Sequence, residues 1–348
     1  MKVKLIGQGA YGCVYNPGVD CNSTIQPGYV SKLVLKDNTS KNEYNIGLDI
    51  KRNIKNFSRY FIIQEKKCMT TRSNLSTTIF NKNMCKLLHN HDDKYMILMS
   101  KYIKSAELHT VLSKYNTSYK VLRLIMCISK RILLLEQANI IHMDMHFANI
   151  LLSNKSNKLY IIDFGLALNT TYFFINKLPN YEYLKINIFN PTIDWEYWTI
   201  EYNLLGYIIK NNVKLSKKVI LSCINDYYDN NNKIKYTFPD KYKYTSVAYN
   251  YFKRCNKGTK DENVIFLLSM CKSWDYYKLA IHITSIYINN EIPTLSLLRD
   301  MLLPDSNRVY GEESILQIKH TLNPRLKLNK INVSITLSAS NSLSITNI

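Results

Sequence analysis

The most constraining feature of the sequence is a set of polar residues inside an apolar stretch near the middle of the chain. The segment HMDMHFANIL, residues 142–151, places two histidines, an aspartate and an asparagine between runs of isoleucine and leucine. Soon afterwards KLYIIDF, residues 158–164, reads as a strand that ends on an aspartate. Core packing gives no reason for these polar groups, because a buried polar side chain costs free energy unless it has a partner. The pattern predicts a polar site held rigidly by short apolar supports.

A second constrained segment lies near the start of the chain. GQGAYGCV, residues 7–14, has the spacing GxGxxGxV between segments 3–6 and 13–15, which read as strands. Glycines in such a turn let backbone N–H groups approach phosphates closely. A dinucleotide-binding version needs a helix directly afterwards, but NPG at 16–18 does not favour one. The setting indicates a flap over a nucleotide, and a glycine hairpin without a ligand stays open at this point.

A lysine and a glutamate downstream could form an ion pair near the flap. Lys32 lies in YVSKLVL, residues 29–35, a predicted strand in which an inward-pointing lysine needs an anionic partner. Glu43 falls on the apolar face of the next predicted helix, for which Asn38 or Ser40 is the expected N-cap. Taken singly, each charge is more typical of a solvated surface. The prediction that Lys32 and Glu43 form a pair is supported only by the motifs on either side of them.

The character of the chain changes near residue 105, from strands to helices. Before it, the patterns predict strands near 3–6, 13–15 and 29–35, a surface loop at 16–28, a helix that continues at 61–68, and a strand pair at 85–89 and 94–102. After it, helical spacing covers 119–138, 195–210, 264–288 and 293–303, and the end from 324 reads as a loose tail.

Composition limits the classes of function. Lys and Arg number 46 against 26 Asp and Glu, a net charge of +20, but the lysines are scattered rather than gathered into one basic segment. Nucleic-acid binding is therefore a secondary expectation. No stretch of about 18 apolar residues occurs, so no membrane span is expected. The eight cysteines form no CxxC pairs and no dense disulfide pattern, which favours a reducing compartment, with Cys13 as a small packing residue or a reactive thiol.

In this order, the motifs resemble the protein kinase family. HxDxxxxN, an apolar strand and then DFG is the family's combination of catalytic loop and metal-binding loop. The resemblance implies that Asp144 orients the substrate hydroxyl and accepts its proton, and that Asn149 and Asp163 hold Mg²⁺ on the phosphates of ATP. It implies that His142 braces the loop. It also implies a nucleotide site made of Lys32, Glu43 and the flap residues Ile6, Gly7, Gln8, Gly9, Ala10, Tyr11, Gly12, Cys13 and Val14.

The resemblance extends into the C-terminal half. SWDYYKLAIHI is similar to the family's DxWSxG helix, which would make Asp275 the buried carboxylate that ties down the catalytic loop. Arg308 would pair with Glu201 of WTIE, where the family usually has APE. The implied fold is α+β and two-lobed: a small β-rich lobe at 1–101 with a hinge near 99–102, a larger helical lobe at 102–320 with a helical insertion at about 202–270, and a loose tail at 321–348.

The chain departs from the family at two loop positions. Met143 replaces the arginine that grips a phosphorylated activation segment, so we expect activity that does not depend on such phosphorylation. His146 replaces a lysine, and HxDxHxxN also resembles aminoglycoside and choline kinase-like enzymes. His142 and His146 are four residues apart, as zinc-binding histidines on a helix would be, but no third ligand is evident.

The expected function is that of an ATP-dependent serine/threonine protein kinase with Mg²⁺. The alternatives are a pseudokinase scaffold, or a small-molecule phosphotransferase. The lean start and the composition rich in Asn, Ile and Lys look most like the serine/threonine protein kinases of large DNA viruses. That likeness implies a monomer that acts on protein substrates in the cytoplasm of an infected cell or within a virion.

Overall fold

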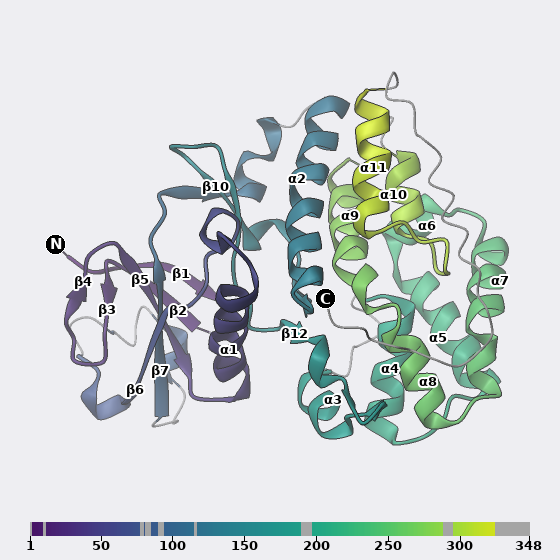
Figure 1. Ribbon diagram of the computed structural model, residues 1–348, viewed down its shortest axis with the longest axis horizontal. Coiled ribbons are helices and arrows are strands. Elements are labelled where there is room, and N and C mark those ends of the chain that lie inside the picture. Colours follow the sequence, from purple (N-terminus) through teal and green to yellow (C-terminus); the bar gives the residue numbers. More distant parts are fainter. Residues whose placement is uncertain are drawn as a thin grey trace.

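The computed structural model combines an antiparallel sheet with a larger group of helices (Figure 1). It describes residues 2–9, 12–76, 80, 85–89, 94–114, 117–188, 197–287 and 295–323. Ala10 and Tyr11 of the expected flap, and the expected tail from residue 324, lie outside these ranges. Within them, no helix is both long enough and apolar enough to cross a bilayer.

The N-terminal part is built on one five-stranded sheet. All neighbouring strands are antiparallel, and their order is β1–β2–β5–β7–β6. The strands are β1 (Lys4–Gly9), β2 (Gly12–Asn16), β5 (Tyr29–Leu35), β6 (Lys66–Thr71) and β7 (Lys94–Lys101). The predicted strand at 29–35 is confirmed with the same bounds. Gly12 is required where β2 meets β5, because a Cβ there would lie 2.6 Å from the Leu33 carbonyl oxygen.

Helix α1 (Asn38–Asn53) packs beside this sheet (Figure 1). It begins one residue before the predicted start: Asp37 is the N-cap, and its carboxylate accepts a hydrogen bond from the Ser40 amide in a reciprocal capping box. Ile46 and Ile50 are buried on its inner face together with Glu43. The helix therefore carries a carboxylate into the space between the sheet and the rest of the molecule.

Three local predictions for this part are wrong. Residues 66–71 form the edge strand β6 and not a helix, and 86–89 form a 3-10 turn (Lys86–His89) and not a strand. The loop at 16–28 contains a small hairpin of β3 (Gly18–Val19) and β4 (Ile25–Gln26). For β6 and β7 the cause is that β7 pairs with β5 and β6 and not with residues 86–89, and local periodicity does not reveal such pairing.

Four of the eight cysteines are paired within the N-terminal part. Cys13 on β2 bonds to Cys85, and Cys21 bonds to Cys68 on β6, each with Cα atoms 6.0 Å apart. Cys13 is fully buried and packs in the core, as predicted, but as one half of a disulfide, so the alternative prediction of a reactive thiol is wrong. The expectation of a reducing compartment disagrees with these bridges.

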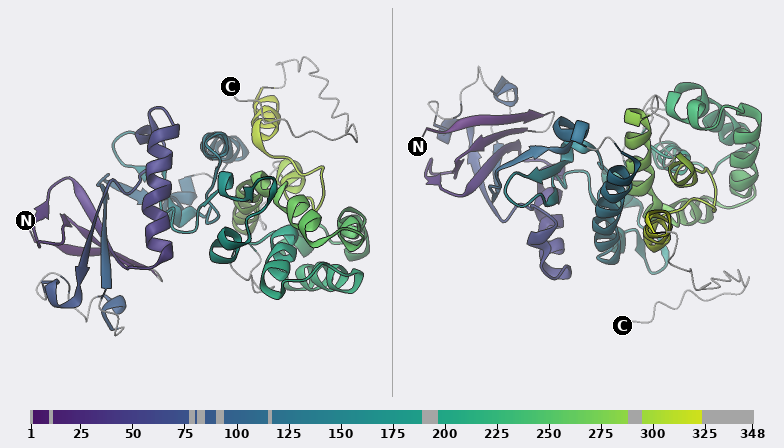
Figure 2. Two further views of the ribbon diagram at one scale, coloured as in Figure 1. Left: turned by 60° about the horizontal axis from the view of Figure 1, so that its bottom comes forward. Right: turned by 90° about the horizontal axis from the view of Figure 1, so that it is seen from above.

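The C-terminal part is helical and begins with α2 (Ser118–Gln137), the predicted helix at 119–138. Figure 2 shows the sheet and α1 on one side of α2 and the later helices on the other. Helix α9 (Trp274–Tyr287) is the inner helix, with most of its side chains buried. The others are α3 (Tyr181–Asn187), α4 (Ile200–Asn211), α5 (Lys217–Asn230), α6 (Asn232–Thr237), α7 (Lys241–Phe252), α8 (Lys260–Leu268), α10 (Leu295–Met301) and α11 (Gly311–Leu322).

Short strands frame the polar loop at 142–149. The loop begins after β9 (Ile140–Ile141), which pairs with β12 (Leu168–Asn169), and it ends at β10 (Ile150–Ser153). Strand β10 lies between β11 (Leu159–Ile161) and β8 (Ser105–Glu107). A further hairpin joins β13 (Phe174–Ile175) to β14 (Leu178–Pro179). The apolar runs on either side of the loop are thus paired strands, which fix both of its ends.

Candidate active site

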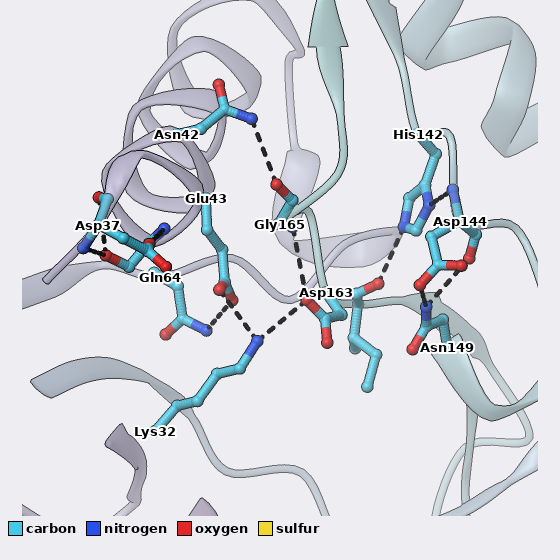
Figure 3. A network of polar contacts seen from close by, with 12 residues as sticks. Lys32, Asp37, Asn42, Glu43, Gln64, His142, Asp144, Asn149, Asp163 and Gly165 are labelled. Carbon is cyan, nitrogen blue, oxygen red and sulfur yellow. Dashed lines mark hydrogen bonds and ion pairs between the residues drawn. The ribbon is translucent and has the colours of Figure 1, made fainter. Parts of the chain in front are cut away.

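Three charged side chains from distant parts of the sequence meet between the sheet and the helices (Figure 3). Lys32 on β5 places its Nζ 2.9 Å from Glu43 Oε2 and 3.0 Å from Asp163 Oδ1. Glu43 Oε1 also accepts a hydrogen bond of 2.9 Å from Gln64. The structure thus brings together one cation and two carboxylates that lie up to 131 residues apart.

The charge on Lys32 is secured by its two partners. Burial alone would lower the pKa of the ammonium, but the charges of Glu43 and Asp163 and their hydrogen bonds outweigh burial and raise it. The Lys32 side chain is 12% exposed and that of Glu43 4%, whereas that of Asp163 is 36% exposed. Asp163 is therefore the member of the group that can meet a ligand from solvent.

Asp163 is held in an unusual backbone conformation. Its φ is +61°, in the left-handed region, and its Oδ1 accepts a long hydrogen bond of 3.4 Å from the Gly165 amide. Asn42 on α1 donates to the carbonyl of Ala167 at 2.8 Å. Contacts from both sides of the turn thus maintain a strained geometry that aims the carboxylate toward Lys32.

Asp144 and Asn149 form the second polar group of the site. The Asn149 amide nitrogen donates to both the backbone carbonyl and Oδ2 of Asp144, each at 3.0 Å. His146 accepts at Nδ1 from the Ala148 amide, so its proton lies on Nε2, which faces Asp144 Oδ2 at 3.4 Å. Burial alone would raise the pKa of Asp144, but the hydrogen bond of His146 and the charge of Lys278 outweigh burial and lower it. The carboxylate is therefore ionised at neutral pH and can accept a proton.

His142 connects this loop to the segment after β11 that carries Asp163. Its Nδ1 accepts from the Asp144 amide at 3.2 Å, which leaves Nε2 to donate to the Ile162 carbonyl at 2.9 Å (Figure 3). The ring also packs on Phe164, with centroids 4.9 Å apart. Both ring nitrogens are used, so His142 has none left for zinc. Among the described residues, no cluster of three or more His, Cys, Asp or Glu side chains could hold a metal.

Asp275 on α9 holds the same loop through its backbone amides. It accepts hydrogen bonds from the backbone amides of His142 at 2.7 Å and Met143 at 2.9 Å. Burial raises the pKa of this carboxyl group, and the two amides oppose that effect. Farther from the loop, Glu201 and Arg308 form a fully buried bidentate ion pair, which Ser273 and Trp274 extend by hydrogen bonds.

A cleft of about 400 Å³ opens beside Lys32 and Asp163. Apolar side chains form two of its walls, and the polar group forms its inner end. The walls are Ile6, Gly7, Val14 and Val30 from the sheet and Ile62, Leu151 and Ile162 from the opposite side; Lys32, Glu43, Gln64 and Asp163 are polar, and Ser100, Lys101, Tyr102, Ile103, Ser105 and Glu107 complete the lining. Its size and composition suit a small ligand with an apolar body and a charged end.

The predicted flap residues do not all line this cleft. Ile6, Gly7 and Val14 do, whereas Gln8, Gly9, Gly12 and Cys13 do not. Cys13 points instead into the disulfide-bonded side of the sheet. Asp144 and Asn149 lie outside the cleft lining, and Figure 3 shows them on the far side of Asp163 from Lys32.

Several residues that shape the site were not anticipated from the sequence. Gln64 and Asn42 support Glu43 and the turn after Asp163, and Leu151 and Ile162 form the floor of the cleft. Leu151 and Ile162 carried a usable signal, since each is an apolar residue within two positions of a predicted site residue. Gln64 carried none, because its position depends on how residues 62–65 pass beneath α1.

The carboxylate of Asp163 and the side chain of Asn149 offer oxygen donors of the type that Mg²⁺ prefers. The family model described as "Protein kinase domain" matches residues 1–173, which include the sheet, α1, the loop at 142–149 and the turn at 163–165. No curated protein matches the chain. The match ends before β13, so α3 to α11 lie beyond it. Residues 1–173, just under half of the chain, are thus similar to a protein kinase domain, and the converging Lys32, Glu43 and Asp163 fit, in general terms, a phosphotransfer site.

Proposed function

We propose that the chain is an ATP-dependent protein kinase that transfers the γ-phosphoryl group to serine or threonine hydroxyls of protein substrates. The observation that carries the proposal is the bridge from Glu43 through Lys32 to Asp163, at one end of a cleft with apolar walls. In protein kinases the lysine–glutamate pair and the DFG aspartate must both be in place for transfer. The sheet with α1 and the helical part would then be the two lobes, with nucleotide between them.

Each residue would have a distinct part in the transfer. The apolar walls would hold the adenine, and Lys32 would contact the phosphates. Asp144 would accept the proton of the substrate hydroxyl while the hydroxyl oxygen bonds to the γ-phosphorus. The bond between the γ-phosphorus and the β–γ bridging oxygen would break, with ADP as the leaving group. Asn149 and Asp163 would hold Mg²⁺, which neutralises phosphate charge when it is bound.

His146 would affect the acceptor side. Its Nε2 lies 3.4 Å from the carboxylate of Asp144, so it competes with an incoming hydroxyl for that oxygen. A protein acceptor and a small-molecule acceptor would both have to displace or share this contact. For that reason the experiment that tests the proposal includes both types of acceptor.

The test is transfer of labelled phosphate from ATP with Mg²⁺ to a protein mixture, to the chain itself and to aminoglycosides or choline. We expect labelled phosphoserine or phosphothreonine with the wild-type chain and none with Asp163→Ala. Asp229→Ala is the matched control, because Asp229 is an exposed carboxylate in a surface ion pair with Lys241. Equal signal from wild type and Asp163→Ala would refute the proposal, and label only in the small molecules would replace the protein acceptor by a small one.

A further inference from the structure

Helix α9 presents three polar side chains to the loop at 142–149. Asp275, Lys278 and His282 are spaced i, i+3 and i+7, so they lie along one face of the helix. Asp275 binds two loop amides, and the ring of His282 lies 6.0 Å from that of His146 and 5.9 Å from that of Phe147. The resemblance to kinases accounts for Asp275 but not for the other two.

Lys278 joins three segments at one point. Its side chain is buried, its Nζ donates a hydrogen bond to the Met143 carbonyl, and the same nitrogen lies 3.7 Å from the centroid of the Trp198 ring. Met143 directly precedes Asp144, and Trp198 begins the WTIE segment that leads into α4. An ammonium between a carbonyl and an aromatic face is held from both sides.

Met143 has a backbone that needs such support. Its φ is +64°, a left-handed conformation that is unfavourable for a residue with a Cβ. Asp275 accepts from its N–H at 2.9 Å, and Lys278 donates to its carbonyl. Both polar groups of this strained residue are therefore fixed by side chains of one helix, and the direction in which Asp144 leaves the chain is fixed with them.

The charge of Lys278 also acts on Asp144. Against the larger effect of burial, the negative charges of Asp144 on the loop and Asp275 on α9 raise the pKa of Lys278. The positive charge of Lys278 in turn lowers the pKa of His282, one turn farther along α9. Burial, with the charges of His146 and Lys278, lowers the pKa of His282 to about 3, so His282 adds no charge of its own at neutral pH. Lys278 is thus the buried cation that favours the ionised form of Asp144 from beneath the loop.

We propose that Lys278 is a positioning residue of the phosphotransfer site, which holds the Met143 carbonyl and supplies positive charge next to Asp144. The inference rests on the proposed function and deepens it. His146 occupies the loop position where the resembling family has a lysine, and Lys278 provides a cation from the neighbouring helix instead. A position that served packing alone would favour an apolar residue, because a buried ammonium costs free energy unless its contacts repay that cost.

The test compares Lys278→Met and Lys278→Arg with the wild type. Methionine keeps an unbranched stem without charge, and arginine keeps a charge that does not titrate below pH of about 12. We expect kcat to fall about 10- to 100-fold in Lys278→Met with the KM for ATP little changed, a smaller loss than for a group that touches the phosphates. Lys278→Arg should recover part of that loss. Lys218→Met, which removes an exposed lysine from α5, should match the wild type.

The pH dependence of kcat separates positioning from simple packing. Burial lowers the pKa of Lys278 to about 8, against the opposing charges of Asp144 and Asp275. Protonated Lys278 is the active form, so wild-type kcat should fall as pH rises through about 8. The fall should be missing in Lys278→Arg. Full activity of Lys278→Met, or the same alkaline fall in Lys278→Arg as in the wild type, would overturn the inference.

Hydrogen exchange provides a readout that does not need activity. In Lys278→Met the amides of residues 142–149 should exchange faster than in the wild type, while α9 stays protected and the thermal midpoint shows that the variant is folded. Unchanged exchange in the loop would overturn the positioning role. If wild-type chain transfers no phosphate at all, the proposed function fails and the phosphotransfer part of the inference fails with it, whereas exchange still supports or overturns the hold on Met143.

Discussion

Replacement of Lys32 by methionine separates the stability of the site from its activity. The Lys32 ammonium has two anionic partners, and of these Glu43 is the more deeply buried. Removing one partner of a buried pair leaves an uncompensated charge and typically costs about 3–5 kcal/mol. We expect about 3 kcal/mol, the lower end of that range, because Gln64 still donates to Glu43. The rate of phosphate transfer should fall about 10²-fold or more, since a contact to the transferring group is lost.

The stability loss should depend on pH with a definite sign. Burial raises the pKa of Glu43, and the charge of Asp163 adds to that effect, while Lys32 opposes both. Without Lys32, folded Glu43 holds its proton more tightly than the unfolded chain does, with an ordinary pKa of about 4.3. The favourable contribution of protonated Glu43 is present below that value and is lost as pH rises through the raised pKa. The stability gap between Lys32→Met and wild type should therefore be small at acid pH and widen toward neutrality.

A second substitution distinguishes the two effects. Glu43→Gln added to Lys32→Met removes the stranded charge, so most of the stability should return while transfer stays low. Denaturant unfolding from about pH 4 to about pH 8 measures the first quantity, and labelled phosphate transfer measures the second. Lys36→Met is the control, because Lys36 is an exposed lysine next to the same strand. Wild-type transfer by Lys32→Met, or no recovery of stability in the double variant, would refute this reasoning.

Three further outcomes are expected. Arg308→Met should destabilise the chain by about 3–5 kcal/mol in denaturant unfolding, because it leaves the buried carboxylate of Glu201 without its cationic partner. Glu201→Gln in the same chain should restore much of the lost stability, and equal stability of the single and double variants would contradict this. The cysteines of the two disulfides are 72 and 47 residues apart, so loss of either bridge alone should lower the free energy of unfolding by about 4 kcal/mol. Reduction of both should raise the number of titratable thiols from four to eight. An unchanged melting curve after reduction would count against the bridges. Phosphatase treatment should leave transfer unchanged, because Met143 offers no charge to a phosphate on the segment after DFG; loss of turnover would show the opposite.

The polar core of the site could be predicted because its residues are marked by local sequence. Lys32 lies within an apolar strand, and Asp144 and Asp163 each lie two or three residues after one, where a charged residue is conspicuous. The order of these motifs along the chain then resembles one family, so their convergence could be expected. The distances among them, and the different exposure of Asp163 and Glu43, required the structure.

Other features depend on packing between segments that are far apart in sequence. Strand β6 was predicted as helix because it lies at the edge of the sheet with a largely exposed burial pattern, so its sequence lacks the alternation that identifies a strand. The partners of the four bridged cysteines could not be deduced from spacing alone. Lys278 looked like an ordinary helical lysine, since its contacts with Met143 and Trp198 join residues 135 and 80 positions away.

The central claim is that Lys32, Asp144, Asn149 and Asp163 surround a single nucleotide–magnesium complex. Titration calorimetry with ATP tests it most directly, with Mg²⁺ present or chelated, on wild-type chain and on Asp163→Ala. We expect one site per chain, with affinity that weakens when Mg²⁺ is removed and when Asp163 is replaced. Absence of heat with wild type, or identical binding by Asp163→Ala in the presence of Mg²⁺, would contradict it.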